Sequence, residues 1–168
     1  MRHATHSSPV TDRADNDQGR LLRLAATIVA ATFLLVGIAG FIPGITTDVE
    51  ELDFAGPHDG MSGQAELLGL FHVSVLHNLV HLSFGIAGLA LARSVRGASG
   101  FLIGGAIIYA LVLVYGLVVD HHSDANFLPV NDADNILHAA LAAGMLLLGL
   151  LLTPRRNQVS PITRREDA

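Results

Sequence analysis

The sequence predicts an all-α integral membrane protein, a four-helix bundle with both termini in the cytoplasm. Of its 168 residues, 51% are hydrophobic and 15% charged, and the mean hydropathy is +0.49. This composition is too apolar for an ordinary soluble domain of that length. Four apolar stretches are long enough to cross a bilayer core of about 30 Å. All ten basic residues are arginines, and all are predicted to lie on one side of the membrane.

The first two predicted helices cover residues 24–42 and 67–92. The first has no charge and ends before Pro43, which cannot continue a helix. A cleaved signal peptide is the alternative for this segment, but the apolar run is longer than such a peptide needs and follows a polar tail. The second segment contains several polar residues, three of them histidines, and ends at Arg93.

The last two predicted helices cover residues 101–119 and 136–152. The third has no charge and is closed by Asp120, and the fourth contains a single polar group, His138. The transmembrane domain is therefore predicted over residues 21–152. The polar tails, 1–20 and 153–168, lack hydrophobic periodicity and are expected to be disordered. The loop 43–65 is rich in turn formers and is expected to have no regular structure.

The arginines predict the orientation, because short loops that carry basic residues stay in the cytoplasm. They precede the first helix, lie between the second and third, or follow the fourth, whereas the other two loops hold ten carboxylates and no arginine. Both termini are thus predicted to be cytoplasmic, in the plasma membrane of a bacterium. Topology and contact with anionic lipid headgroups account for these arginines. The lipid bilayer is the expected partner, nucleic-acid binding is not expected, and protein partners are unknown.

A short internal repeat links the second and fourth helices, because both contain the pattern Asn-x-x-His. The two copies are Asn78 with His81 and Asn135 with His138. Both helices run from outside to inside in the predicted topology, so a twofold axis along the membrane normal could relate the two helical hairpins. We find no matching repeat between the first and third helices.

The repeat also predicts a polar cluster within the outer leaflet. Its members are His77, Asn78, His81, Asn135 and His138. Counting back from the cytoplasmic arginines at about 1.5 Å per residue gives similar depths for His77, Asn78, His81 and His138. On the second helix they lie three or four residues apart and form one stripe with Ser74. Polar groups at this depth should face the bundle or a wet cavity. His72, expected at the interface, and Asp134 are secondary candidates.

Four interpretations of the cluster remain open. The imidazoles and amides could join the helices by structural hydrogen bonds. They could bind a small ligand, an ion or a proton from outside, since histidine titrates near neutral pH. His138 with His77 or His81 could hold a haem b as axial ligands, which would make the protein an electron carrier. His77 and His81, with or without His138, could bind a divalent metal, although a lone His-x-x-x-His has low specificity.

The loop after the third helix is a weaker metal candidate, through His121, His122 and Asp124. Its polar groups are more simply explained by contact with water, and Asn131 and its neighbours suit the cap of the next helix. The chain has no cysteine, which excludes disulfides, thiol nucleophiles and cysteine-ligated metals. No phosphate-binding loop, HExxH motif or nucleophile elbow is present. We therefore do not expect an enzyme, and the identity of any cofactor remains unknown.

Small residues recur at spacings that let helices approach closely, within one chain or between copies in a homo-oligomer. The pairs are Gly37 with Gly40, Gly85 with Gly88, Gly100 with Gly104, and Ala140 with Gly144.

Three motifs carry a resemblance to a known family. They are FLLVGIAGFIPG at 33–44, LGLFHVSVLHNLVH at 68–81, and ANFLPVN followed by ADNILH at 125–138. Together they resemble small actinobacterial membrane proteins grouped as domain of unknown function 4383, over residues 21–152. The resemblance implies a four-helix integral membrane protein and marks the two Asn-x-x-His motifs as family features, but it implies no reaction.

Overall fold

The computed structural model describes residues 9–56, 65–123 and 125–154. Four helices account for most of it: α1 (Pro9–Ala39), α2 (Val75–Leu91), α3 (Val95–Val118) and α4 (Asp132–Leu152). Three of them, α1, α3 and α4, are long and apolar enough to cross a membrane, and α2, with 17 residues, is a shorter apolar helix. The four-helix membrane fold is therefore confirmed.

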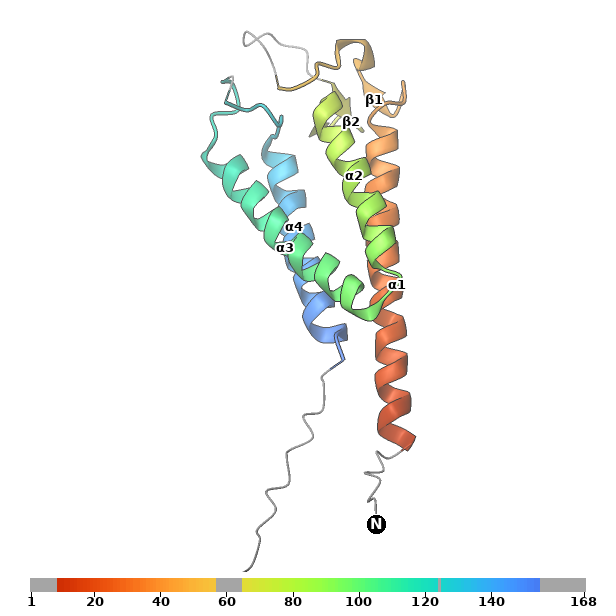
Figure 1. The fold of residues 1–168 in the computed structure, drawn as a ribbon. Coiled ribbons are helices and arrows are strands. Elements are labelled where there is room, and N and C mark those ends of the chain that lie inside the picture. The colour runs from red at the N-terminus through yellow and green to blue at the C-terminus, as the bar shows by residue number, and fades with distance from the viewer. Residues whose placement is uncertain (1–8, 57–64, 124, 155–168) are drawn as a thin grey trace, which may run out of the picture.

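The helices form two antiparallel pairs (Figure 1). Helix α1 packs along α2 and α3 along α4, and the two pairs meet mainly between α1 and α3. Helix α1 begins and α4 ends at one end of the bundle, which we call the terminal end. There the Gln18 side chain donates to the carbonyl of Leu151 (2.9 Å), and Arg23 Nε donates to the carbonyl of Ala92 (3.1 Å).

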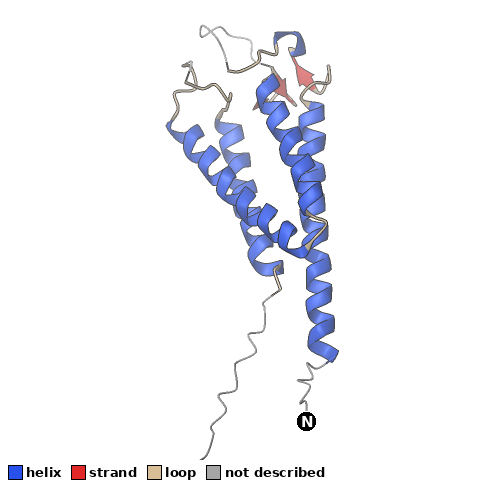
Figure 2. Cartoon of the chain, in the orientation of Figure 1, coloured by secondary structure: helices blue, strands red, loops and turns tan. Residues whose placement is uncertain are grey.

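The opposite end, which we call the sheet end, carries a small antiparallel sheet (Figure 2). Its strands are β1 (Thr46–Thr47), β2 (Glu66–Leu67) and β3 (Phe71–His72), in the order β1-β2-β3, and a 3-10 helix, η1, covers Val49–Glu51. Ala65, Leu67 and Val73 form a small core beneath this sheet. The expectation of a loop without regular structure over 43–65 is therefore wrong for residues 43–56, which contain β1 and η1. Residues 57–64 lie outside the described part of the chain.

The second helix is shorter than predicted, because residues 67–74 belong to β2, β3 and their connections. A continuous apolar run does not by itself distinguish a strand from a helix. Ser74 decides the boundary: its hydroxyl accepts from the amide of His77 (3.1 Å) and caps α2.

The other helices are also displaced from their predicted bounds. Helix α1 ends at Ala39 and begins at Pro9, so the part of the predicted tail from 9 to 20 is helical. A helix already nucleated in the membrane extends at little cost per residue, and proline favours its first turn. Helices α3 and α4 begin earlier than predicted because Ser94 and Asn131 cap them. The rest of the predicted tails, 1–8 and 155–168, lies outside the described residues.

The buried positions repeat between the two pairs. Four buried residues of α1 correspond to four buried residues of α3 that lie 76 positions later in the sequence. They are, in order, Leu22, Ala26, Ala30 and Phe33 on α1, and Ala98, Leu102, Ala106 and Tyr109 on α3. Four buried residues of α2 likewise correspond to four buried residues of α4 that lie 57 positions later. They are, in order, His77, Asn78, His81 and Gly88 on α2, and Asp134, Asn135, His138 and Met145 on α4. The capping residues Ser74 and Asn131 also correspond. This correspondence extends the sequence repeat to all four helices and indicates an approximate twofold axis between α1 and α3.

Candidate functional site

All five predicted cluster residues are buried in the half of the bundle nearer the sheet. The exposed fraction is 7% or less for each of them, namely His77, Asn78, His81, Asn135 and His138. Two capped helix starts position them. Ser74 caps α2 three residues before His77, and a reciprocal capping box between Asn131 and Asp134 starts α4 just before Asn135. The cap predicted at Asn131 is thus confirmed.

The three histidines belong to one circuit of rings with two aromatic side chains. His81 stacks on Phe33 with ring centroids 5.6 Å apart, and Phe33 stacks on Tyr109 at 5.2 Å. Tyr109 contacts His138 at 5.4 Å. His77 closes the circuit, 6.3 Å from His138 and 4.8 Å from His81.

This circuit follows the internal repeat. Phe33 corresponds to Tyr109 and His81 to His138, so the contact between the two aromatic rings lies where the approximate twofold axis passes. His77 breaks the symmetry, because its counterpart on α4 is the carboxylate Asp134. Four rings of the circuit therefore come from corresponding positions of the two helical pairs. The fifth ring, His77, is present only in the first pair.

The two asparagines lie at separate helix contacts. Asn135 Nδ2 donates to the carbonyl of Gly116 on α3 (3.0 Å). A Cβ atom at Gly116 would lie within 1.9 Å of Asn135 Oδ1, and one at Gly40 within 2.1 Å of Asn78 Oδ1. Each asparagine thus fits against a glycine of its own helical pair. The hydrogen bond of Asn135 favours the structural interpretation for this residue.

Several buried polar atoms of the cluster have no hydrogen-bond partner among the described residues. They are Nδ1 of His77, His81 and His138, both amide atoms of Asn78, and Oδ1 of Asn135. An unsatisfied buried polar group costs about 1–3 kcal/mol. Native proteins keep such groups rare, so several in one region require an explanation, such as a bound water, ion or proton.

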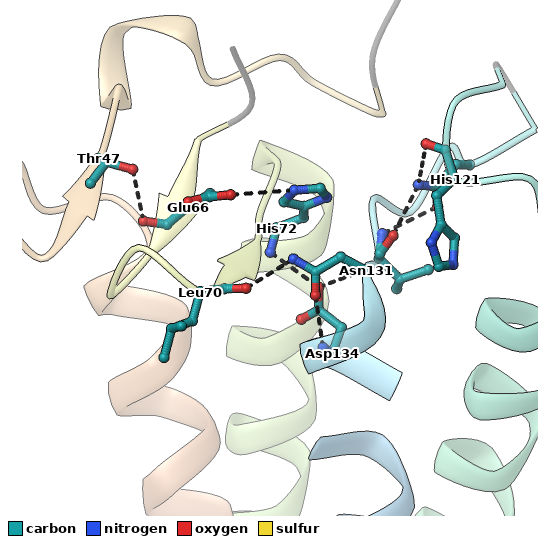
Figure 3. A network of polar contacts seen from close by, with 9 residues as sticks. Thr47, Glu66, Leu70, His72, His121, Asn131 and Asp134 are labelled. Carbon is teal, nitrogen blue, oxygen red and sulfur yellow. Dashed lines mark hydrogen bonds and ion pairs between the residues drawn. The ribbon is translucent and has the colours of Figure 1, made fainter. Parts of the chain in front are cut away.

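The secondary candidates His72 and Asp134 are joined at the sheet end (Figure 3). The backbone amides of His72 (3.1 Å) and Asn131 (3.0 Å) both donate to Asp134 Oδ2. The His72 ring faces Glu66, its Nε2 lying 3.5 Å from Oε1, and the two form an ion pair when His72 is protonated. Burial lowers the pKa of His72, and the charge of Glu66 opposes this change. The network ties β3 of the first pair to the start of α4 in the second.

Within residues 9–56, 65–123 and 125–154, no three His, Asp or Glu side chains converge as metal ligands would. His121 Nε2 lies 2.8 Å from the carbonyl of Gly116, and His122 is exposed to solvent. Asp124 lies outside the described residues. Of the predicted loop candidates, His121 thus contacts a backbone carbonyl and His122 faces solvent.

The ring circuit also bears on the haem hypothesis. A haem held by two of the histidines would place its porphyrin between their rings, yet His77 and His81 stack on each other. Phe33 contacts His81, and Tyr109 contacts His138. A porphyrin could enter only if these aromatic contacts were broken. The geometry disfavours this alternative.

Sequence reasoning missed the partners of the cluster on α1 and α3. These are the aromatic residues Phe33 and Tyr109 and the glycines Gly40 and Gly116. In both helices the aromatic residue precedes the glycine by seven positions, as Phe-x6-Gly and Tyr-x6-Gly. That spacing was the signal that could have revealed the repeat between these helices.

A family model matches residues 23–151, which is most of the chain, and its description is Domain of unknown function (DUF4383). The chain belongs to this family. The match confirms the resemblance carried by the three sequence motifs, and it covers all of the ring circuit and both Asn-x-x-His motifs. No curated protein and no solved structure matches the chain.

Proposed function

We propose that this member of the family binds a proton at its buried histidine cluster, as a non-enzymatic component of a bacterial plasma membrane. The observation that carries the proposal is the group of three imidazoles, His77, His81 and His138, with centroids 4.8 and 6.3 Å apart along the circuit. Their Nδ1 atoms are buried and unpartnered in the described structure. An imidazole can accept one proton, and adjacent imidazoles can share it.

The proposed orientation places the sheet end outside the cell and both termini in the cytoplasm. Arg13, Arg20 and Arg23 lie toward the terminal end of α1, and Arg93 and Arg96 lie at the α2–α3 turn. Basic residues near membrane ends favour the cytoplasmic side. The histidines, near the sheet end, would then exchange protons with the external medium.

A proton fits this site better than the other ligands considered. A divalent metal needs converging ligands, which the described residues do not provide. A small hydrogen-bonding molecule could occupy the same polar atoms, and its binding would be distinguished from proton uptake by its dependence on ligand concentration rather than on pH alone.

The chain supplies its own reporter for the test. It has no tryptophan and two tyrosines, and Tyr109 contacts His138. Replacing Tyr115 by Phe keeps the ring that packs on Phe127 and leaves Tyr109 as the single tyrosine. Protonation of an imidazole changes how it quenches a neighbouring tyrosine, so the fluorescence of this variant in lipid vesicles should change as the pH is lowered from about 8 to below 5.

Two further substitutions in that background decide the result. His138→Phe keeps a ring beside Tyr109 but removes the proton acceptor, so it should abolish most of the pH dependence. His122→Phe, at an exposed loop position, is the matched control and should retain it. Emission that does not respond to pH while His138 is present would overturn the proposal and favour histidines that serve only as structural contacts.

A further inference from the structure

We propose that the turn between β2 and β3 is a membrane anchor that inserts into the interfacial region of the outer lipid leaflet. We call this turn, residues 68–70, the β2–β3 tip. It lies at the sheet end, apart from the histidine cluster, and its partner is the bilayer rather than a protein. Backbone conformation, side-chain exposure, continuity with a lipid-facing helix and depth along the bundle support the proposal.

The tip has an unusual sequence for its backbone shape. Leu68 has φ 57° and Gly69 has φ 65°. Two successive residues with positive φ form the tight hairpin turn that normally takes Asn, Asp or Gly. A bulky leucine in this conformation is a genuine outlier. Leu68 is also 65% exposed, and Leu70 is 57% exposed. A strained leucine with no packing role inside the protein points to a contact outside it.

The tip continues an apolar strip of α1. Leu35 and Ile38 are exposed on the membrane-spanning helix, where lipid is the solvent, and Ile42 and Ile45 are exposed in the turns that follow its end at Ala39. The amide of Leu68 donates to the carbonyl of Ile45 (2.8 Å), which places the tip next to the end of this strip. Exposed apolar residues thus follow one another along the chain from the lipid-facing helix to Ile45, the residue bonded to the β2–β3 tip.

The length of α2 sets the depth of the tip. Its 17 residues rise about 26 Å at 1.5 Å per residue, less than the bilayer core of about 30 Å. The sheet residues that directly precede α2 must therefore lie at the level of the membrane boundary. Asn131 Nδ2 donates to the carbonyl of Leu70 (2.9 Å), which ties the tip to the start of α4 at the same level (Figure 3).

The absence of cysteine in the chain allows a direct test. Single variants Leu68→Cys, Leu70→Cys and Glu50→Cys are labelled with an environment-sensitive nitrobenzoxadiazole dye and reconstituted in nanodiscs of phosphatidylcholine and phosphatidylglycerol. Glu50, exposed in η1 at the same end of the molecule, is the matched control. The dye at 68 and 70 should emit at shorter wavelength than at 50 and be quenched more strongly by spin-labelled acyl chains.

Equal emission and quenching at all three positions would overturn the proposal, since the tip would then face water and would be free for another protein. Leu70→Cys keeps the test valid if a substitution in the strained position of Leu68 disturbs the turn. Circular dichroism of each labelled protein confirms that the helices are retained. The result is independent of the histidines, because none of the three labelled positions belongs to the ring circuit.

Discussion

His72 shows how a single residue connects the sheet to the bundle. Its backbone amide donates to Asp134 on α4, while its ring pairs with Glu66 on β2. The sequence placed this residue away from the polar stripe of the second helix, and the structure agrees, because it lies on β3 before α2 begins. Its link to Asp134 could not be predicted, because the two residues are 62 positions apart and no motif joins them.

The lowered pKa of His72 predicts a pH effect on stability. Below its ordinary pKa of about 6.5, the unfolded chain binds a proton that the folded chain resists. The free energy of unfolding should therefore fall as the pH drops through this range. Thermal unfolding in detergent at about pH 7.5 and about pH 5.5 measures the change. His72→Gln should reduce the difference between the two conditions, and the exposed-site variant His122→Gln should leave it unchanged. An unaltered difference in His72→Gln would contradict the prediction.

Glycines are the decisive residues at the level of helices. Gly37, Gly40, Gly85 and Gly88 each lie against a neighbouring helix or side chain, as the small-residue spacings predicted. In contrast, Gly100, Gly104 and Gly144 have open space where a Cβ would lie. Homo-oligomer formation through these open positions stays a prediction. Spacing alone could not distinguish the two sets, since it does not show which helix face meets a partner.

This difference gives a matched pair of substitutions. Gly116→Ala would place a methyl group against Asn135, and we expect a loss of about 1–3 kcal/mol in the free energy of unfolding from the forced rearrangement. Gly100→Ala meets nothing within 4 Å, and it should be neutral or slightly stabilising, because alanine favours helices. Denaturant unfolding of the two proteins in the same detergent compares them. If both alanines were equally tolerated, the contact between Gly116 and Asn135 would not be as close as described.

For the whole molecule, composition and hydrophobic length were enough to predict four apolar helices, three of which are long enough to cross a membrane, because the bilayer demands long apolar segments. The candidate site was predicted in part. The Asn-x-x-His pattern identified four of the five cluster residues, and the polar stripe on the second helix added His77. Phe33 and Tyr109 were missed because aromatic residues in an apolar helix do not stand out. The sheet was missed for a related reason: its strands are two residues long, too short for an alternating pattern to emerge.

The orientation of the whole molecule is tested with fusions. A reporter that is active only in the cytoplasm should be active after Ala168, and one that is active only outside should be active within residues 57–64. Both results follow from the distribution of arginines. A cytoplasmic signal from the 57–64 fusion would reverse the orientation and place the histidine cluster near the inner surface. The helical pairs themselves would be unaffected by that reversal.

The start of α1 and the end of α4 at one end of the bundle have a consequence for chain connectivity. Each helical pair is a complete up-and-down unit, and the pairs are joined by the short turn at Arg93–Ser94. A circular permutant that opens this turn and joins the original termini by a flexible linker would run α3-α4-α1-α2 and could keep every helix in its place. In the same way, the two halves could be produced as separate chains and reassemble, which would make the ring circuit of the native protein an interface between subunits.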